Sequence, residues 1–217
     1  MDHAGKRAGK RMCGSHRSAT AALVVVLVLL AARQSAAQHS AENTPAIDFT
    51  DWSNIRIKAY SQAVALPFPE PMAELSVPRL HLFAPLFDGI DDVTLDRGVG
   101  RIPGTALPGE SGNVGVAGHR DGFFRRLKDI QVGDTIEISA ADQSTTYRVE
   151  RVEIVSPSDV QVLKSGSTSS LTLVTCYPFY FAGHAPQRFI VEATLVQHSA
   201  KAQSAAPERH VASANEQ

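Results

Sequence analysis

The chain opens with a basic, polar arm and one unbroken apolar stretch, and then changes to short apolar runs separated by polar turns. The apolar stretch is residues 19–32 (ATAALVVVLVLLAA), and small residues follow it at 35–37. A basic arm, an apolar stretch of this length and small residues beyond it are typical of an export signal. We therefore expect residues 1–37 to be a signal or membrane anchor, with the rest of the chain outside the cytoplasm.

Residues 38–71 are predicted to be a linker that contains one short helix. Within 50–64, five residues fall on one helical face: Trp52, Ile55, Ala59, Tyr60 and Ala63. Thr50 or Asp51 is predicted to cap the start of this helix. The segment LPFPEP at 66–71 is predicted to end it, because its three prolines cannot continue a helix.

From residue 72 to 197, runs rich in valine, isoleucine, leucine and threonine alternate with turn residues. This pattern predicts strands near residues 73–77, 80–86, 113–117, 134–139, 145–155, 170–175 and 188–196. A helical turn is expected near 123–128, and DDVTLDRG at 91–98 is interpreted as a turn. Many short strands at this spacing favour an all-β barrel or sandwich. Residues 198–217 lack apolar periodicity and are expected to be a disordered tail.

Composition narrows the choice of function without deciding it. Apolar residues make up 43% of the chain and charged residues 20%, which suits a soluble globular body. The formal net charge of −1 gives no global reason to expect a nucleic-acid partner.

Cys176 is the first candidate for chemistry. Cys13 lies in the basic arm and cannot pair with it across a membrane, so the exported part has one cysteine and no internal disulfide. Cys176 ends the strand-like run 171–175, where a nucleophile would have a fixed backbone and an exposed side chain. The alternative interpretation is a small buried residue, which is common for free cysteine.

A thiol needs a nearby base or cation to act as a nucleophile at neutral pH. His119 ends the strand-like run 113–118 and can therefore lie on the same rim as Cys176. His184, in a turn eight residues after Cys176, is the rival candidate. His81 is expected on a strand face that points toward water.

Acyl transfer also needs a donor that holds the developing oxyanion. Arg188 begins the run 188–191 and emerges near Cys176 if the two strands are neighbours. Arginine keeps its proton, so it can serve as a donor but not as a base. The alternative is a solvated arginine at a strand end.

Three segments resemble the signatures of the sortase family. Residues 172–176 (TLVTC) resemble the TLxTC signature, and 116–120 (VAGHR) resemble the strand-end histidine motif. Arg188, twelve residues after the cysteine, falls where sortases carry their arginine. The extended segments 118–124 and 175–179 look most like class D sortases.

The resemblance implies an eight-stranded β-barrel with short helices, tethered to the membrane at the cell surface by the N-terminal segment. It implies cleavage of an LPxTG-like sorting motif in protein substrates and transfer to an amine of a cell-wall precursor or a pilin lysine. Cys176 would be the nucleophile, and His119 would transfer protons. Arg188 would hold the substrate and the oxyanion, and Thr175 would help to position the substrate.

The family's third catalytic partner is the arginine, so Asp121 is interpreted as a loop residue. No spacing of His, Cys and Asp resembles a metal-ligand set, so no metal or other cofactor is expected. Two alternative functions are compatible with the same residues. One is a cysteine endopeptidase that only hydrolyses, and the other is a non-catalytic exported barrel that binds a surface partner and in which Cys176 is buried.

Overall fold

The computed structural model describes residues 47–141, 143–166, 168–180 and 183–200. The predicted arm and apolar stretch of residues 1–37 lie outside the described residues, as does the predicted tail from residue 201 on. The first three residues assigned to that tail, 198–200, instead belong to the last strand, where they pair with residues 143–145. Within the described ranges, no helix combines the length and apolar character needed to cross a bilayer.

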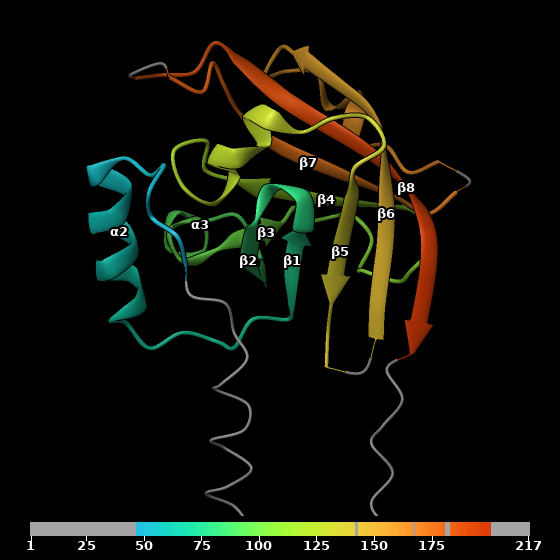
Figure 1. Cartoon of the computed structure of the whole chain (residues 1–217), viewed down its shortest axis with the longest axis horizontal. Helices are drawn as coiled ribbons and strands as arrows, with labels where there is room; N and C mark the ends of the chain where they lie inside the picture. Colours follow the sequence, from blue (N-terminus) through green and yellow to red (C-terminus); the bar gives the residue numbers. More distant parts are fainter. Residues whose placement is uncertain (1–46, 142, 167, 181–182, 201–217) are drawn as a thin grey trace, which may run out of the picture. The chain divides into compact units, whose positions relative to one another are not determined.

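Eight strands close into a barrel in the order β1-β2-β3-β4-β7-β8-β6-β5 (Figure 1). Their bounds are β1 Ala73–Val77, β2 Leu82–Asp88, β3 Val99–Arg101, β4 Asn113–Gly118, β5 Thr135–Ser139, β6 Gln143–Val155, β7 Ser170–Tyr177 and β8 Gln187–Ala200. Two of the pairings, β2 with β3 and β4 with β7, are parallel, and the rest are antiparallel. The expected eight-stranded all-β barrel is therefore confirmed.

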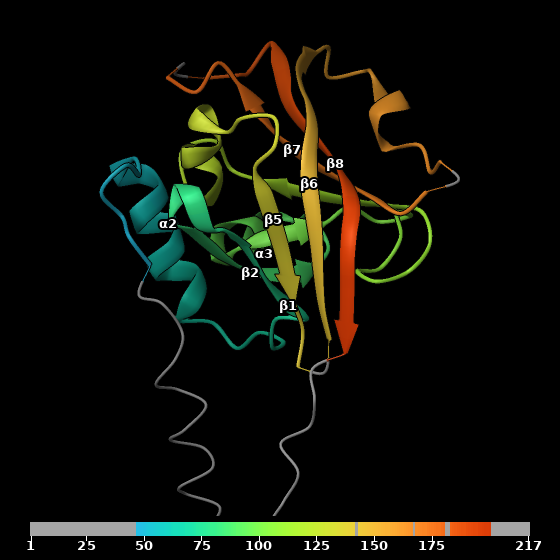
Figure 2. The ribbon, with the colours of Figure 1, turned by 45° about the vertical axis from the view of Figure 1, so that its right-hand side comes forward.

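Side-chain alternation explains the strands on one side of the barrel. In β5, Ile136 and Ile138 are buried while Thr135, Glu137 and Ser139, which alternate with them, are partly exposed. This period of two is what a half-buried strand requires. The long strands β6 and β8 lie side by side and pair along nearly their whole length (Figure 2).

Strands β4 and β7 are buried over most of their length, and apart from Asn113 and Tyr177 their residues are apolar or small. A Cβ on Gly115 would lie within 3.3 Å of side chains of Thr105, Leu163 and Ile102, which cover the outer face of β4. Leu163 ends a short 3-10 helix, η3 (Val160–Leu163). The cover on both faces explains why these two strands are continuous rather than alternating runs.

The predicted N-terminal helix is present as α2, Asn54–Val64, although its cap differs from the expectation. Ser53, not Thr50 or Asp51, caps it, since its hydroxyl accepts a hydrogen bond from the Arg56 amide. The helix ends where the proline-rich segment begins, as predicted.

The face by which α2 packs is narrower than the sequence suggested. Trp52 and Tyr60 pack edge-on against Phe123, with ring centroids 4.7 and 6.1 Å away. Phe123 begins the 3-10 helix η2 (Phe123–Asp129), which confirms the predicted helical turn. Ile55, by contrast, is 80% exposed, so its placement on the packed face was wrong.

Three further corrections concern short elements. The segment interpreted as a turn at 91–98 contains a helix, α3 (Asp92–Arg97), capped by Asp91. It leads into β3, a three-residue strand that no sequence pattern indicated. His81 does not lie in a strand: it follows the 3-10 helix η1 (Pro78–Leu80) with a left-handed φ of 48°.

Candidate active site

Backbone register brings three of the predicted site residues to one rim of the barrel. Gly118, the last residue of β4, pairs with Thr175 in the parallel β4–β7 ladder, so His119 and Cys176 are each the next residue along. Cys176 in turn pairs with Arg188 in the antiparallel β7–β8 ladder. The three positions are therefore fixed by main-chain hydrogen bonds between neighbouring strands, rather than by loops.

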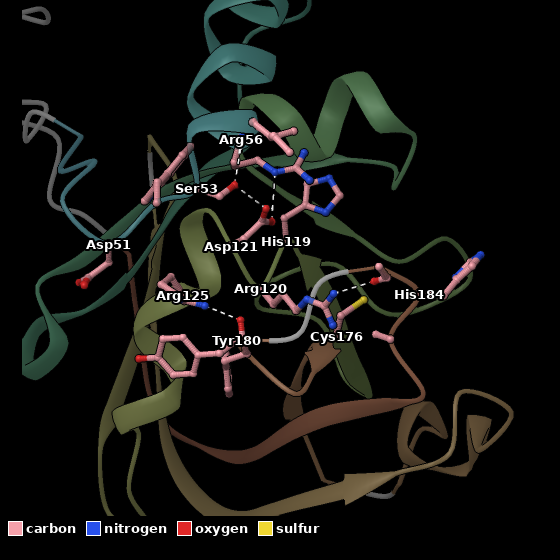
Figure 3. Close-up of a pocket in the computed structure, with 15 residues that line it drawn as sticks. Asp51, Ser53, Arg56, His119, Arg120, Asp121, Arg125, Cys176, Tyr180 and His184 are labelled. Carbon is pink, nitrogen blue, oxygen red and sulfur yellow. Dashed lines mark hydrogen bonds and ion pairs between the residues drawn. The ribbon is translucent and has the colours of Figure 1, made fainter.

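Cys176 opens onto a pocket of about 610 Å³ (Figure 3). Its walls come from residues 51–56 at the start of α2, from residues 119–125, and from the segment that follows β7. The thiol is half-buried and forms no disulfide. This exposure contradicts the alternative in which Cys176 is a buried structural residue.

His119 faces the helices and not open solvent. Its Nε2 lies 3.6 Å from Asp96 Oδ1 on α3, and a quarter of its side chain is exposed. Burial lowers the pKa of His119 below its usual 6.5, and the nearby Arg56 guanidinium lowers it further, against the opposing carboxylates of Asp96, Asp121 and Asp92. Neutral imidazole is thus the main form at neutral pH.

Asp121, interpreted from sequence as a loop residue, ties the loop after His119 to α2. Its carboxylate accepts hydrogen bonds from the Ser53 hydroxyl at 2.7 Å and from Arg56 Nε at 3.2 Å. Burial opposes its ionisation, but the bond from Ser53 and the charge of Arg56 together lower the pKa of Asp121 below 3.8. The carboxylate is therefore charged and holds the loop that begins at His119.

Arg188 lies beside Cys176 by register, but its guanidinium bonds the backbone elsewhere. Nη1 donates to the carbonyls of Gln187 at 3.0 Å and Ala185 at 3.3 Å. The side chain does not line the pocket described above. The structure thus confirms that the strands of Cys176 and Arg188 are neighbours, and the catalytic role of Arg188 stays a prediction.

Thr175 is 2% exposed, and its hydroxyl donates to the Gly118 carbonyl at 2.7 Å. That bond ties β7 to β4 immediately before His119. The side chain is turned into the protein, so any effect on substrate passes through this strand contact.

The rival His184 lines the same pocket, although its side chain is exposed. It belongs to the segment between β7 and β8, in which Arg120 Nη2 donates to the Gly183 carbonyl at 2.8 Å. Arg125 packs over the Tyr180 ring, 4.0 Å from its centroid, at the start of the same segment. The strand ladder that places His119 beside Cys176 does not extend to His184.

Sequence reasoning missed three charged residues at this site: Arg56, Asp96 and Arg120. Arg120 is the residue after His119 in the histidine motif, so the motif could have pointed to it, but no role was predicted for it. Arg56 and Asp96 lie on separate short helices, and nothing in the spacing of the chain connects them with His119.

Comparison with known proteins gives one consistent family. A sequence model of the sortase domain matches residues 75–196, more than half of the chain. Sortase D of Bacillus subtilis is 32% identical over 118 residues, an alignment that covers 54% of this chain and 60% of that relative. The chain thus spans less than two thirds of the length of this relative.

Solved structures agree. The Clostridium perfringens Sortase D5 transpeptidase superposes with a TM-score of 0.54 at 26% identity, covering 69% of this chain and 91% of that one. Sortase E1 of Streptomyces coelicolor, solved with a tripeptide in its active site, gives 0.56 at 28% identity, covering 64% and 95%. With a matching domain, a class D relative and sortase structures on the same barrel, this chain belongs to the sortase family of cysteine transpeptidases.

Proposed function

We propose that this protein is a membrane-anchored transpeptidase that acts outside the cytoplasm. It cleaves an LPxTG-like motif near the C-terminus of protein substrates and joins the new end to an amine. One observation carries the proposal: the ladders of β4, β7 and β8 set His119, Cys176 and Arg188 on one rim, with the thiol open to a large pocket.

The first half of the reaction forms a thioester. The Cys176 thiolate attacks the carbonyl carbon of the motif's threonine, and the His119 imidazolium gives its proton to the nitrogen of the glycine. The carbon–nitrogen bond breaks, and the C-terminal fragment leaves as a free amine. The N-terminal part stays on the sulfur as a thioacyl group.

The second half reverses these roles. The acceptor amine attacks the thioacyl carbon, and neutral His119 takes the proton that the amine releases. The sulfur–carbon bond breaks, which restores the thiolate and the imidazolium. Because the pKa of His119 is lowered, only part of the enzyme at neutral pH holds the protonated imidazolium that the first half needs.

Arg188 supplies a positive charge near the oxyanion that forms during each half. In the described state its guanidinium bonds the carbonyls of Ala185 and Gln187. We expect substrate to replace these carbonyls as the acceptor. Thr175 supports substrate positioning through its bond to Gly118, which fixes the strand edge before His119.

Protein substrates need a sorting motif, and the acceptor is an amine of a cell-wall precursor or a pilin lysine. The pocket walls formed by 51–56 and by the segment after β7 leave Cys176 accessible for such an amine. The basic arm and apolar stretch within residues 1–37 support a location of the barrel outside the cytoplasm, because this pattern is typical of an export signal.

The test uses the full-length chain, an LPxTG-type peptide and an excess of a small amine, with products followed by mass spectrometry. We expect a ligated peptide with the wild type and none with Cys176→Ala. Cys13→Ala is the matched control, because it removes the other cysteine, and it should ligate normally. Hydrolysed peptide without ligation would favour the endopeptidase. No turnover across a panel of motif variants, together with a Cys176 thiol that resists iodoacetamide, would exclude both the transpeptidase and the endopeptidase.

A further inference from the structure

Helix α2 lies outside the segment that matches the sortase domain, yet it supplies a charge to the site. The match begins at residue 75, whereas Arg56 is on the first turn of α2. Arg56 forms an ion pair with Asp96 of α3 and a second one with Asp121, at 3.2 Å. Its side chain is only 17% exposed, so these contacts are shielded from solvent.

One carboxylate oxygen is shared between this arginine and the candidate acid–base residue. Asp96 Oδ1 accepts from Arg56 Nη1 and also lies 3.6 Å from His119 Nε2. In Figure 3 the side chains of Arg56 and His119 point toward one another, and Asp121 lies below them. The imidazole therefore lies beside a carboxylate that favours its protonation and near a guanidinium that opposes it.

We propose that Asp96 and Arg56 are positioning residues for His119, holding its imidazole at the rim and setting, by opposite charges, how readily it accepts a proton. The inference rests on the proposed transpeptidation for its consequence, but the arrangement itself is independent of turnover. It makes α2 a functional part of the active site, although the helix precedes the segment that matches the sortase domain.

The docking of α2 fits such a role because its first turn is held tightly against the loop that follows His119. A Cβ on Gly122 would meet Arg56 Cγ at 2.9 Å, so only glycine leaves room for the arginine stem. Ser53 caps the helix and donates to Asp121 with the same hydroxyl. The side chain of Arg56 is thus fixed at both its stem and its head.

The charge balance explains why both partners are needed. Arg56 without Asp96 would leave a guanidinium beside the imidazole and suppress its protonation. Without Arg56, the carboxylates of Asp96 and Asp121 would both stabilise the imidazolium, which would then release its proton less readily. Asp92 adds a further negative charge from α3, and Arg120 and Cys176 face the same pocket.

The direct test is a titration of the His119 imidazole by NMR in the full-length Cys176→Ala protein, which needs no turnover. Asp96→Asn should lower the pKa of His119, and Arg56→Gln should raise it. Opposite shifts are the diagnostic result, because loss of structure alone would expose the ring and move both variants in one direction.

Two further variants keep the test sharp. Arg56→Lys keeps the charge and should titrate close to the wild type, whereas a purely structural role would make it resemble Arg56→Gln. Arg79→Gln removes the same charge from the Arg79–Asp134 ion pair, which does not contact His119, and should leave the titration unchanged.

Turnover provides the second readout. In the wild-type background, Asp96→Asn should lower kcat by about tenfold and change KM by less than about twofold. Unchanged titrations in both variants would overturn the inference even if the enzyme ligates peptides. Opposite shifts without any ligation by the wild type would instead leave the charge balance intact and refute the proposed function.

Discussion

The two walls of the site are built by different means. On one wall, β4, β7 and β8 fix Cys176 and the backbone of His119 through a continuous ladder of main-chain bonds. On the other wall, α2 and α3 contribute side-chain charges, Arg56 and Asp96, that meet at the imidazole. The strand wall decides where Cys176 and His119 stand, whereas the helix wall places charged side chains beside the His119 imidazole.

This difference predicts two kinds of mutational response. Main-chain ladders are insensitive to charge and depend on packing behind them, so damage to the strand wall should appear as lost stability. Arg56 and Asp96 lie outside the buried apolar core of the barrel, so damage to the helix wall should appear mainly as altered activity in a protein that still folds.

The largest effect is expected at Arg188, which stands on the strand wall and for which we propose a role that depends on its charge. Arg188→Ala should lower kcat/KM by about 10²–10³-fold with little loss of stability, because an oxyanion would lose its donor. Arg188→Lys should recover little of this, since a point charge does not replace the planar guanidinium. Steady-state kinetics and thermal unfolding check both variants. Wild-type kinetics in Arg188→Ala would remove this residue from the mechanism.

The strand wall itself is probed by Leu173→Ala. Leu173 is fully buried in β7, three residues before Cys176, and truncation should destabilise the fold by about 2–5 kcal/mol. Activity per folded molecule should stay within about twofold, because the β4–β7 ladder uses backbone atoms. Denaturant unfolding with kinetics at low temperature separates the two quantities. A large loss of activity in fully folded protein would contradict the division of roles.

Trp52→Ala is the corresponding probe of the helix wall. Loss of the edge-on contacts with Phe123 and Tyr60 should cost only about 1–3 kcal/mol. The activity of the folded protein should nevertheless fall more than in Leu173→Ala. Without the Trp52 contacts, α2 is held less firmly, and Arg56 moves with it away from Asp96 and Asp121. The same pair of measurements applies. An equal or smaller loss than in Leu173→Ala would show that α2 is only a cover.

The smallest effect concerns a charge pair remote from both walls. Arg79 and the amide of Gln131 bond the Asp134 carboxylate, and these contacts lower its pKa below 3.8. A lowered carboxyl pKa contributes stability above the unfolded value, near pH ~4, and that contribution disappears as pH falls through the folded value.

Asp134→Asn should therefore cost about 1–2 kcal/mol at pH 7. The difference from wild type should shrink as the pH falls below about 4, as measured by denaturant unfolding across pH. Activity at pH 7 should be unchanged. A difference that stays constant with pH would mean that the carboxylate charge does not contribute.

Much of the strand wall could be predicted from the sequence because it follows from local patterns. Apolar runs that end at His119 and Cys176 are readable as strands, and the barrel and these two strand ends were predicted correctly. The helix wall could not be predicted in the same way. A six-residue helix such as α3 is shorter than two turns, so DDVTLDRG has the composition of a turn and gives no usable period.

The cap of α2 shows the same limit on a smaller scale. Thr50, Asp51 and Ser53 are all good caps, and local propensity does not choose among them. Ser53 is selected because its hydroxyl also reaches Asp121, 68 positions away. Likewise, Ile55 suits a packed face by periodicity but is exposed, since Trp52 and Tyr60 make the contact with Phe123.

The sequence alone therefore determined the all-β strand pattern and the strand-end positions of Cys176 and His119, and its resemblance to sortases indicated the barrel, because hydrophobic period and motif spacing are properties of neighbouring residues. Only the tertiary structure decided which strands pair, that Cys176 is accessible, and that Arg56 and Asp96 meet at His119. Those features arise where separate elements pack together, and the energy of an ion pair depends on distance and burial, which the order of residues does not specify.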